Sequence, residues 1–396
     1  MLRHRPPTPA QRACVDALAP AFDRVAARAR AADREGLLSP ETWSDLVASG
    51  YLRLFHPASL GGAGADGLTL ALAMERLASA CASAFWTASI STILCGKLLA
   101  ELCGPRHRAR WLPPILAGAR IGCFAATERG AGCDPGSYEA RARRTVDGWR
   151  LSGVKTKISN ATTADVAVVL ARRDDPERPG LCYAVVDLHK PGVSRRELAK
   201  IGLRAMSWGT LEFDDVALDE GDVIVDASVD RTLEVVEWGQ LMQAVSALGL
   251  AEAALDRARA HALERRAFGR PLAHMQIVHA RLADMQVELD AARLLTREAA
   301  RRRAEGQSVR EEVMMAKVYA TEMAVRTADR ALRILGGAGF CTDSDVERLY
   351  RDSLANVPAG LPTDRLRELL GCAALSIDPW SYPPFDWLTP AGLRID

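Results

Sequence analysis

The feature that most constrains the fold of this chain is a hydrophobic periodicity that changes twice along its length. Over residues 9–120, apolar side chains recur every three or four positions, which is typical of amphipathic helices. Between residues 121 and 225 the segments become short and rich in β-branched residues, with Gly, Asp and Asn between them, which favours strands. Helical periodicity returns from residue 229. The chain is therefore expected to bury apolar surface between helices, then between strands, then between helices again.

These changes predict an α+β protein of three domains. An N-terminal helical domain is expected over residues 1–120, a middle β domain over 121–226 and a C-terminal helical bundle over 227–396. The middle segments are short enough for a small barrel or a sandwich. A length of 396 residues accommodates two or three such units, and a hydrophobic share of 48% supplies a sizeable core.

The composition argues against several classes of protein. Lys and Arg number 51 against 50 for Asp and Glu, and without a basic block this balance does not favour nucleic-acid binding. None of the nine cysteines forms a CxxC pair, so neither a zinc site nor a disulfide framework is expected. The longest apolar stretch, "SAFWTASISTILCG", is shorter than a membrane span, and the N-terminus lacks an apolar signal core. We expect a cytoplasmic protein with no membrane, nucleic-acid or metal partner.

A glycine-rich segment, "AATERGAGCDPGS", lies at the entry to the β region, over residues 125–137. It combines Thr127, Glu128, Cys133 and Asp134 with glycines that allow close backbone approach. No GK[ST] follows it, so it is not a phosphate loop of the P-loop type. The residues alone leave two interpretations open, a plain interdomain loop and a ligand-binding loop.

Five motifs in order resemble those of the acyl-CoA dehydrogenase family. They are "TERGAGCD", "SGVKTKISN", "GLRAMSWGTLEFDDVAL", "RRAFGRPLAHMQIVHARLADM" and "ILGGAGFCTDSDVERLYRD". Each is weak alone, but together they extend the resemblance over nearly the whole chain. The resemblance implies an N-terminal helical domain, a middle β domain, a C-terminal four-helix bundle and FAD. In this family the flavin accepts a hydride, while the protein positions and polarises the thioester.

The same resemblance assigns residues to FAD. Phe124, Ala126 and Thr127 correspond to a strap against the flavin ring. Arg265 and Phe268 correspond to a pair that holds the pyrophosphate and adenosine of a neighbouring subunit's FAD, for which a planar guanidinium is well suited. The implied FAD contacts are Phe124, Ala126, Thr127, Lys157, Ser159, Arg265, Phe268, Gln276, Arg333, Gly336 and Gly337. A homo-oligomer, either a dimer or a tetramer, or a hetero-oligomer is therefore expected.

Three positions in these motifs depart from the family pattern. Cys133 stands where a serine usually contacts the thioester arm, and we assign it to the substrate. Lys157 replaces a tryptophan of the flavin face, and Arg333 replaces a glutamine near the nucleotide end. The changes remove one aromatic wall and add two cations close to the implied FAD.

The largest departure is the loop "VPAGLPTD", where the family has an E-G-T motif with its catalytic glutamate. Ala359 and Gly360 stand at the Glu and Gly positions, and no acid occurs between Asp352 and Asp364. We assign Ala359 and Gly360 to the substrate side of the site. Some relatives carry the base on the first long C-terminal helix, at a position that Gly239 occupies here.

Glu237 is the acid nearest to that alternative position and is our candidate for the base. It lies two residues from Gly239, which is about 200° around a helix, so a different helix start would be needed to bring it into the site. A carboxylate that stabilises the helix start is the alternative role for Glu237.

The resemblance thus predicts an FAD-dependent oxidoreductase of the CH–CH bond of an acyl thioester, carried by coenzyme A or an acyl carrier protein in a biosynthetic pathway. General-base help is typically worth about 10²–10⁴-fold, so the base is expected to be relocated or not needed. The expected electron acceptor is an electron-transfer flavoprotein or oxygen. A flavin-dependent monooxygenase or N-oxygenase, the base-lacking subunit of a heteromeric dehydrogenase, and a flavin-free homologue remain alternatives.

Overall fold

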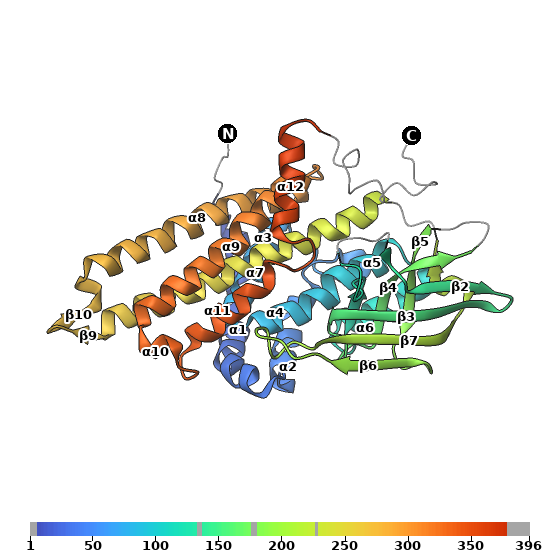
Figure 1. The fold of residues 1–396 in the computed structure, drawn as a ribbon, viewed down its shortest axis with the longest axis horizontal. Coiled ribbons are helices and arrows are strands. Elements are labelled where there is room, and N and C mark those ends of the chain that lie inside the picture. Colours follow the sequence, from blue (N-terminus) through green and yellow to red (C-terminus); the bar gives the residue numbers. More distant parts are fainter. Residues whose placement is uncertain (1–5, 133–136, 176–179, 226–228, 378–396) are drawn as a thin grey trace.

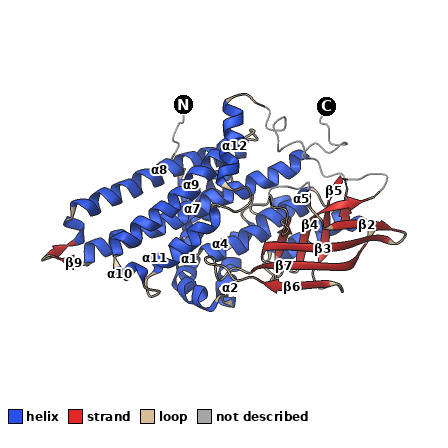
Figure 2. Ribbon diagram, in the orientation of Figure 1, coloured by secondary structure: helices blue, strands red, loops and turns tan. Residues whose placement is uncertain are grey.

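All but two of the described strands gather at one end of an elongated molecule, and helices form most of the rest (Figures 1 and 2). The computed structural model describes residues 6–132, 137–175, 180–225 and 229–377. Along the chain, helices come first, then strands, then helices, in the order that the periodicity predicts.

Six helices and two single 3₁₀ turns make up the described N-terminal part. The helices are α1 (Pro9–Glu35), α2 (Pro40–Ser49), α3 (Gly67–Ala80), α4 (Ala82–Ser89), α5 (Gly96–Glu101) and α6 (Pro105–Leu116). Thr8 begins α1 through a capping box with Gln11, which satisfies the free N–H groups of the first turn. Gly36 and Gly50 end α1 and α2 in left-handed conformations, at φ of 71° and 79°, as their sequence positions predict.

The apolar stretch noted in the sequence forms the centre of the N-terminal domain. A π-helical turn over Ile90–Cys95 joins α4 to α5. The resulting run, Ala82–Glu101, has the length and hydropathy of a membrane span, yet its apolar window is 100% buried inside the protein. Its hydrophobicity is accounted for by packing, because a core helix must be apolar on all sides.

The described strands of the middle domain form one mixed 8-stranded sheet. The strands are β1 (Gly122–Ala125), β2 (Arg141–Thr145), β3 (Gly148–Ser159), β4 (Val166–Asp174), β5 (Gly180–Asp187), β6 (Val193–Glu197), β7 (Trp208–Leu218) and β8 (Val223–Ile224). Along the sheet their order is β6-β7-β3-β2-β4-β5-β8, and β1 pairs in parallel with β4. Both β1 and β2 therefore lie along β4, which places the segment after β1 beside β3.

Strand β4 separates the two main cores of the molecule. Val166, Val168 and Leu170 belong to the core that the helices share, whereas Ala167 and Val169 belong to the core of the β domain. Because side chains alternate across a strand, a strand covered on both faces must be apolar throughout. The sheet is thus joined to the helices by packing.

The C-terminal part is built on three long helices that share a core with α3. Its elements are α7 (Val229–Glu264), β9 (Arg266–Ala267), β10 (Arg270–Pro271), α8 (Gln276–Ala304), α9 (Arg310–Leu335), α10 (Gly337–Phe340), α11 (Asp345–Ser353) and α12 (Thr363–Ala374). The helix α11 packs on α7 and α9 as the fourth member of this bundle. The β9–β10 hairpin lies at the end of the molecule farthest from the sheet (Figure 1).

Candidate active site

The strap predicted to face the flavin lies directly after β1. The segment 156–160 runs alongside it, because the Thr156 N–H donates to the Thr127 carbonyl at 2.9 Å and the Asn160 amide donates to the Gly122 carbonyl at 3.2 Å. Phe124, Thr127 and Ser159 are half-buried, as is Ala126, although the neighbouring strand residues are buried. These four residues therefore form a partly open edge with apolar and hydroxyl groups.

A buried ion pair fixes the shape of the strap. Lys155 is fully buried, and its Nζ donates to Glu128 Oε1 at 2.6 Å and to the Ala126 carbonyl at 2.8 Å. The Glu128 carboxylate also accepts the N–H groups of Glu139 and Ala140, at 2.6 and 3.1 Å. Burial lowers the pKa of Lys155, and the bond to Glu128 opposes that shift. Glu128 is thus a positioning residue, which the sequence analysis did not recognise.

Strand β3 carries a bulge where the family pattern is broken. Its register with β7 shifts between Lys155 and Ile158, and Lys157 adopts a φ of 59°, a conformation uncommon for a residue with a side chain. Lys157 is exposed beside the strap. Ser159, after the bulge, pairs with Trp208 of β7 and returns to the half-buried edge.

The π-helical turn of the N-terminal domain anchors β1 from the other side. Ser91 Oγ accepts the Gly122 N–H at 2.9 Å, and the Asn160 amide donates to the Thr87 carbonyl at 3.0 Å. Asn160 is fully buried at a φ of 64°, which an asparagine tolerates better than most residues. The strap, β3 and α4 are therefore held in one arrangement.

The loop that lacks the family's glutamate is held by its main chain. The Nζ of fully buried Lys317, on α9, donates to the carbonyls of Ala359, at 2.5 Å, and Leu361. Gly360 has a φ of 60°, and a Cβ added there would come within 3.0 Å of Gln243 Nε2. A neutral amide thus lies against the loop from α7.

The helix face below this loop carries further neutral polar groups. Ser246 Oγ accepts hydrogen bonds from Trp86 Nε1 at 3.2 Å and from Asn356 Nδ2 at 3.4 Å. The side-chain oxygens of Gln240, Gln243 and Asn356 are buried and have no hydrogen-bond partner among the described residues. Near the loop, these amides and the hydroxyl are therefore neutral polar groups, beside the Lys317 ammonium that holds its main chain.

Glu237 points into an ion-pair cluster at the start of α7. Its carboxylate lies 2.5 Å from Arg303 Nη1 and 3.4 Å from Arg310 Nε, and Glu237 is 8% exposed. The Arg303 guanidinium also lies over the Trp238 ring, 4.9 Å from its centroid. Two guanidinium groups therefore hold this carboxylate through charge-assisted contacts. A catalytic role for Glu237 stays a prediction. In this structure its ion pairs with Arg303 and Arg310 connect α7 to α8 and α9.

The residues predicted for the nucleotide end of FAD lie far from the strap. Arg265, Phe268 and Gln276 are exposed in and around the β9–β10 hairpin, at the opposite end of the molecule from the sheet (Figures 1 and 2). Phe268 is 95% exposed. One chain therefore does not bring both groups of FAD residues together, and a shared site requires a second chain.

The diglycine also presents its backbone at the surface. Gly336 and Gly337 are exposed, and a Cβ added to either would meet nothing within 4 Å. Arg333, one turn earlier, has an ion pair with Asp329 at 2.7 Å. Cys133, the residue predicted for the thioester arm, lies outside the described residues.

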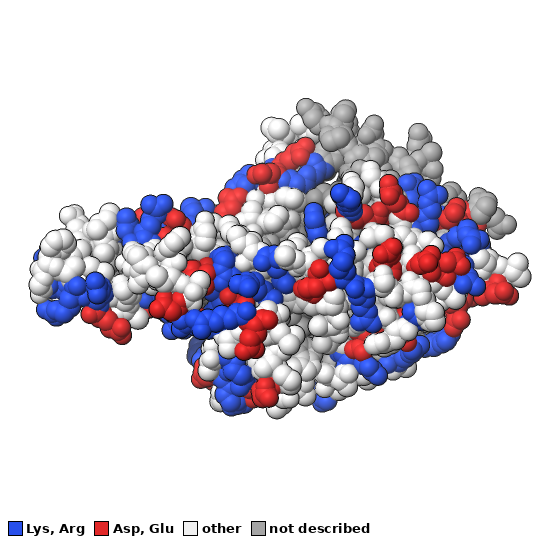
Figure 3. Space-filling model, turned by 60° about the horizontal axis from the view of Figure 1, so that its bottom comes forward, with Lys and Arg blue, Asp and Glu red and all other residues white. Residues whose placement is uncertain are grey.

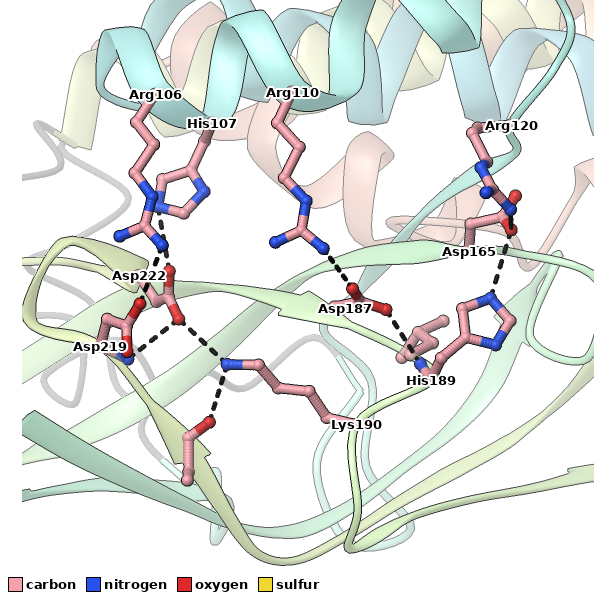
Figure 4. Close-up of polar contacts among 12 residues, drawn as sticks. Arg106, His107, Arg110, Arg120, Asp165, Asp187, His189, Lys190, Asp219 and Asp222 are labelled. Carbon is pink, nitrogen blue, oxygen red and sulfur yellow. Dashed lines mark hydrogen bonds and ion pairs between the residues drawn. The ribbon is translucent and has the colours of Figure 1, made fainter.

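Charge pairs fix the β domain against α6 and the segment after it (Figure 4). Arg110 binds Asp187 at 2.5 Å, and Arg120 binds Asp165 at 2.8 Å. Burial alone would raise the pKa of Asp165, but its hydrogen bonds from the Ile121 N–H and Arg120 outweigh that effect and hold the pKa below its usual value. His107, on α6, reaches Asp222 at 3.1 Å.

The residues at the strap fit a flavin. A flat ring needs a partly open edge with hydroxyl and backbone donors, and the edge formed by Phe124, Ala126, Thr127 and Ser159 provides it. Among the described residues no group of three His, Cys, Asp or Glu is placed to hold a metal ion. The fold and this edge agree with the class that the sequence motifs imply, the flavin-dependent oxidoreductases of acyl thioesters.

Family models place the chain within that class more closely. The acyl-CoA dehydrogenase N-terminal domain matches residues 8–119, the middle domain matches 123–216 and the C-terminal domain matches 229–372. The chain belongs to the acyl-CoA dehydrogenase family, whose members are FAD-dependent oxidoreductases of the CH–CH bond of acyl thioesters.

Similarity to individual proteins supports the same family assignment. The chain is 34% identical over 325 residues to the human mitochondrial short-chain specific acyl-CoA dehydrogenase, covering 81% of this chain and 79% of that protein. It is 32% identical over 327 residues to the caffeyl-CoA reductase–Etf complex subunit CarC of Acetobacterium woodii, covering 81% and 86%. The butyryl-CoA dehydrogenase of Megasphaera elsdenii superposes with a TM-score of 0.89 at 26% identity, covering 94% of this chain and 100% of that one.

Proposed function

We propose that this protein uses FAD to dehydrogenate an acyl thioester in a biosynthetic pathway, with no carboxylate base from the loop at residues 357–362. The observation that carries the proposal is the loop itself. Ala359 and Gly360 replace the glutamate motif, Lys317 holds the loop through main-chain carbonyls, and Gln243 lies against it. The loop is therefore fixed in the fold by these contacts, and it contains no acidic residue at the position of the family's glutamate.

Bound FAD would supply the hydride acceptor. The strap residues Phe124 and Thr127 would orient the ring edge, and Ser159 would add a second hydroxyl contact. The amides of Gln240 and Gln243 would line the substrate side with neutral groups. Because these groups do not take up protons near neutral pH, the α-proton must leave to a relocated base or be acidic enough to leave without one.

We infer the electron acceptor and the oligomeric state from relatives in the same family and from the position of the hairpin. An electron-transfer flavoprotein is the acceptor we propose, because the Acetobacterium woodii relative is a subunit of a caffeyl-CoA reductase–Etf complex. A homo-oligomer is proposed because the hairpin that carries Arg265 and Phe268 lies at the end of the molecule farthest from the sheet that bears the strap. We propose that it works in the cytoplasm.

The experiment is anaerobic reduction of the bound flavin by acyl thioesters presented on coenzyme A and on an acyl carrier protein. Bleaching by one carrier and not by the other identifies the substrate class. If no thioester bleaches the flavin and an external reductase does, with oxygen then entering a product, the proposal fails in favour of an oxygenase. A chain that is yellow only beside a second protein would indicate the heteromeric alternative.

A matched pair of substitutions tests the loop. Ala359→Glu restores a carboxylate at the family position, and we expect acyl-CoA to reduce the flavin about 10²-fold faster or more. Ala359→Gln has nearly the same size and no basic oxygen, so its rate should stay at the wild-type level. Equal rates in both variants would show that proton removal does not depend on this position.

A further inference from the structure

A pocket of about 270 Å³ lies where the three domains meet, and none of the residues assigned to FAD lines it. Arg30 and Arg34 reach it from α1, Arg204 from the loop between β6 and β7, and Arg348 and Arg351 from α11. On the face shown in Figure 3, Lys and Arg side chains gather beside Asp and Glu near the middle.

Two of the three carboxylates that line the pocket are fully engaged, and the third, Asp345, is hydrogen-bonded through only one of its oxygens. Arg351 binds Asp33 at 2.7 Å and Glu347 at 2.6 Å, so it uses two of the three acids. The third, Asp345, has one oxygen 3.1 Å from Arg257, which lies outside the lining. Five arginines therefore face three carboxylates, and the acids are directed mainly to Arg351 and Arg257.

Arg348 is buried without its full set of partners. It is 6% exposed, and its nearest carboxylate oxygens, on Asp345 and Asp352, lie 3.5 and 3.6 Å away. Charge-assisted bonds to a guanidinium are usually 2.7–2.9 Å long. Its Nε, and that of Arg30, have no hydrogen-bond partner within the described ranges. A guanidinium has five N–H donors, and leaving buried donors unused is costly.

The rim of the pocket is held in place while its cations stay accessible. The Leu203 N–H donates to Asp352 at 2.5 Å, and a Cβ on Gly202 would lie 2.2 Å from the Arg351 carbonyl. The backbone that carries Arg204 is thus fixed against α11. Arg204 and Arg34 are exposed. The guanidinium groups of Arg30 and Arg348, deeper in the pocket, and of Arg34 and Arg204, at its rim, thus come from α1, α11 and the loop between β6 and β7.

We propose that this pocket binds a compact phosphoryl anion, either free or as the terminal phosphate of a larger ligand. Arg30 and Arg348 would bind its oxygens from below, and Arg34 and Arg204 from the rim. The planar fork of arginine matches phosphate oxygens. The volume is slightly below the range of about 300–1,000 Å³ for whole ligands, so it fits a phosphoryl group better than a nucleotide. Binding would join the three domains at their common junction.

The test uses the FAD-loaded, full-length protein, so that the cofactor site is filled. Calorimetric titration with inorganic phosphate, pyrophosphate and AMP should show saturable binding with a Kd below about 1 mM for at least one of them. Tighter binding of phosphate or pyrophosphate identifies a free anion, and tighter binding of AMP identifies a phosphate ester. Acetate at the same ionic strength should bind far more weakly.

Two exposed arginines provide the variants, because neither supports the core. Arg204→Gln and Arg34→Gln should each weaken binding about tenfold, with flavin absorbance unchanged. Arg150→Gln removes an arginine of β3 that pairs with Asp215, and it should leave the affinity unchanged. The proposal is overturned by an absence of saturable binding in the wild type, by equal binding of acetate, or by wild-type affinity in both pocket variants.

Discussion

Two fully buried lysines hold the two sides of the active site in different ways. Lys155, behind the flavin strap, reaches the carboxylate of Glu128. Lys317, behind the substrate loop, reaches the main-chain carbonyls of Ala359 and Leu361. The strap therefore depends on a particular acidic side chain. The loop depends on backbone groups, which every residue has, so it can lose a glutamate without losing its support.

The strongest test of this comparison is Lys155→Met. It would leave Glu128 buried without its cation, which typically costs about 3–5 kcal/mol of unfolding free energy. Urea unfolding followed by circular dichroism measures the loss, and flavin absorbance reports the strap. Adding Glu128→Gln should recover part of the stability, because it removes the unpaired buried charge, although its single amide oxygen can replace only one of the two carboxylate oxygens that accept the Glu139 and Ala140 N–H groups. A double variant as unstable as the single one would contradict this account.

A third buried group, Asp352, should make stability depend on pH. Burial raises the pKa of Asp352 to about 6, although Arg348 and the Leu203 N–H lower it in part. A pKa raised above the unfolded value gives stability that is present in acid and lost as the pH rises. The unfolding free energy of the wild type relative to Asp352→Asn should therefore fall by about 2 kcal/mol between pH 4 and pH 7. If the unfolding free energies of the wild type and of Asp352→Asn changed with pH in parallel, a contribution from the titration of Asp352 would be excluded.

A smaller effect is expected for Lys317→Met. The carbonyls of Ala359 and Leu361 would lose a donor, but no buried carboxylate would be left unpaired. We expect a loss of about 2 kcal/mol and faster protease cleavage within residues 357–362. Lys157→Met, at an exposed lysine, should change stability by less than about 0.5 kcal/mol. If Lys317→Met were as damaging as Lys155→Met, the contrast between side-chain and main-chain support would fail.

Much of the fold was predictable because it depends on local patterns. The capping residues Thr8 and Ser39 and the terminating glycines Gly36 and Gly50 act on neighbouring backbone, so sequence spacing locates α1 and α2. The strap containing Thr127 was predictable for a similar reason, since it belongs to a contiguous motif. The role of Glu128 was missed, because its partner Lys155 comes from the next motif.

The sequence by itself determined the helix–strand–helix order, the family and the absence of an acid at Ala359 and Gly360, because periodicity and residue identity are properties of the chain alone. Only the tertiary structure decided that Glu237 pairs with Arg303 and Arg310. It also decided that the hairpin carrying Arg265 lies at the end of the molecule farthest from the sheet that bears the strap. Each of these facts depends on which distant segments pack together, and burial then fixes which charges find partners.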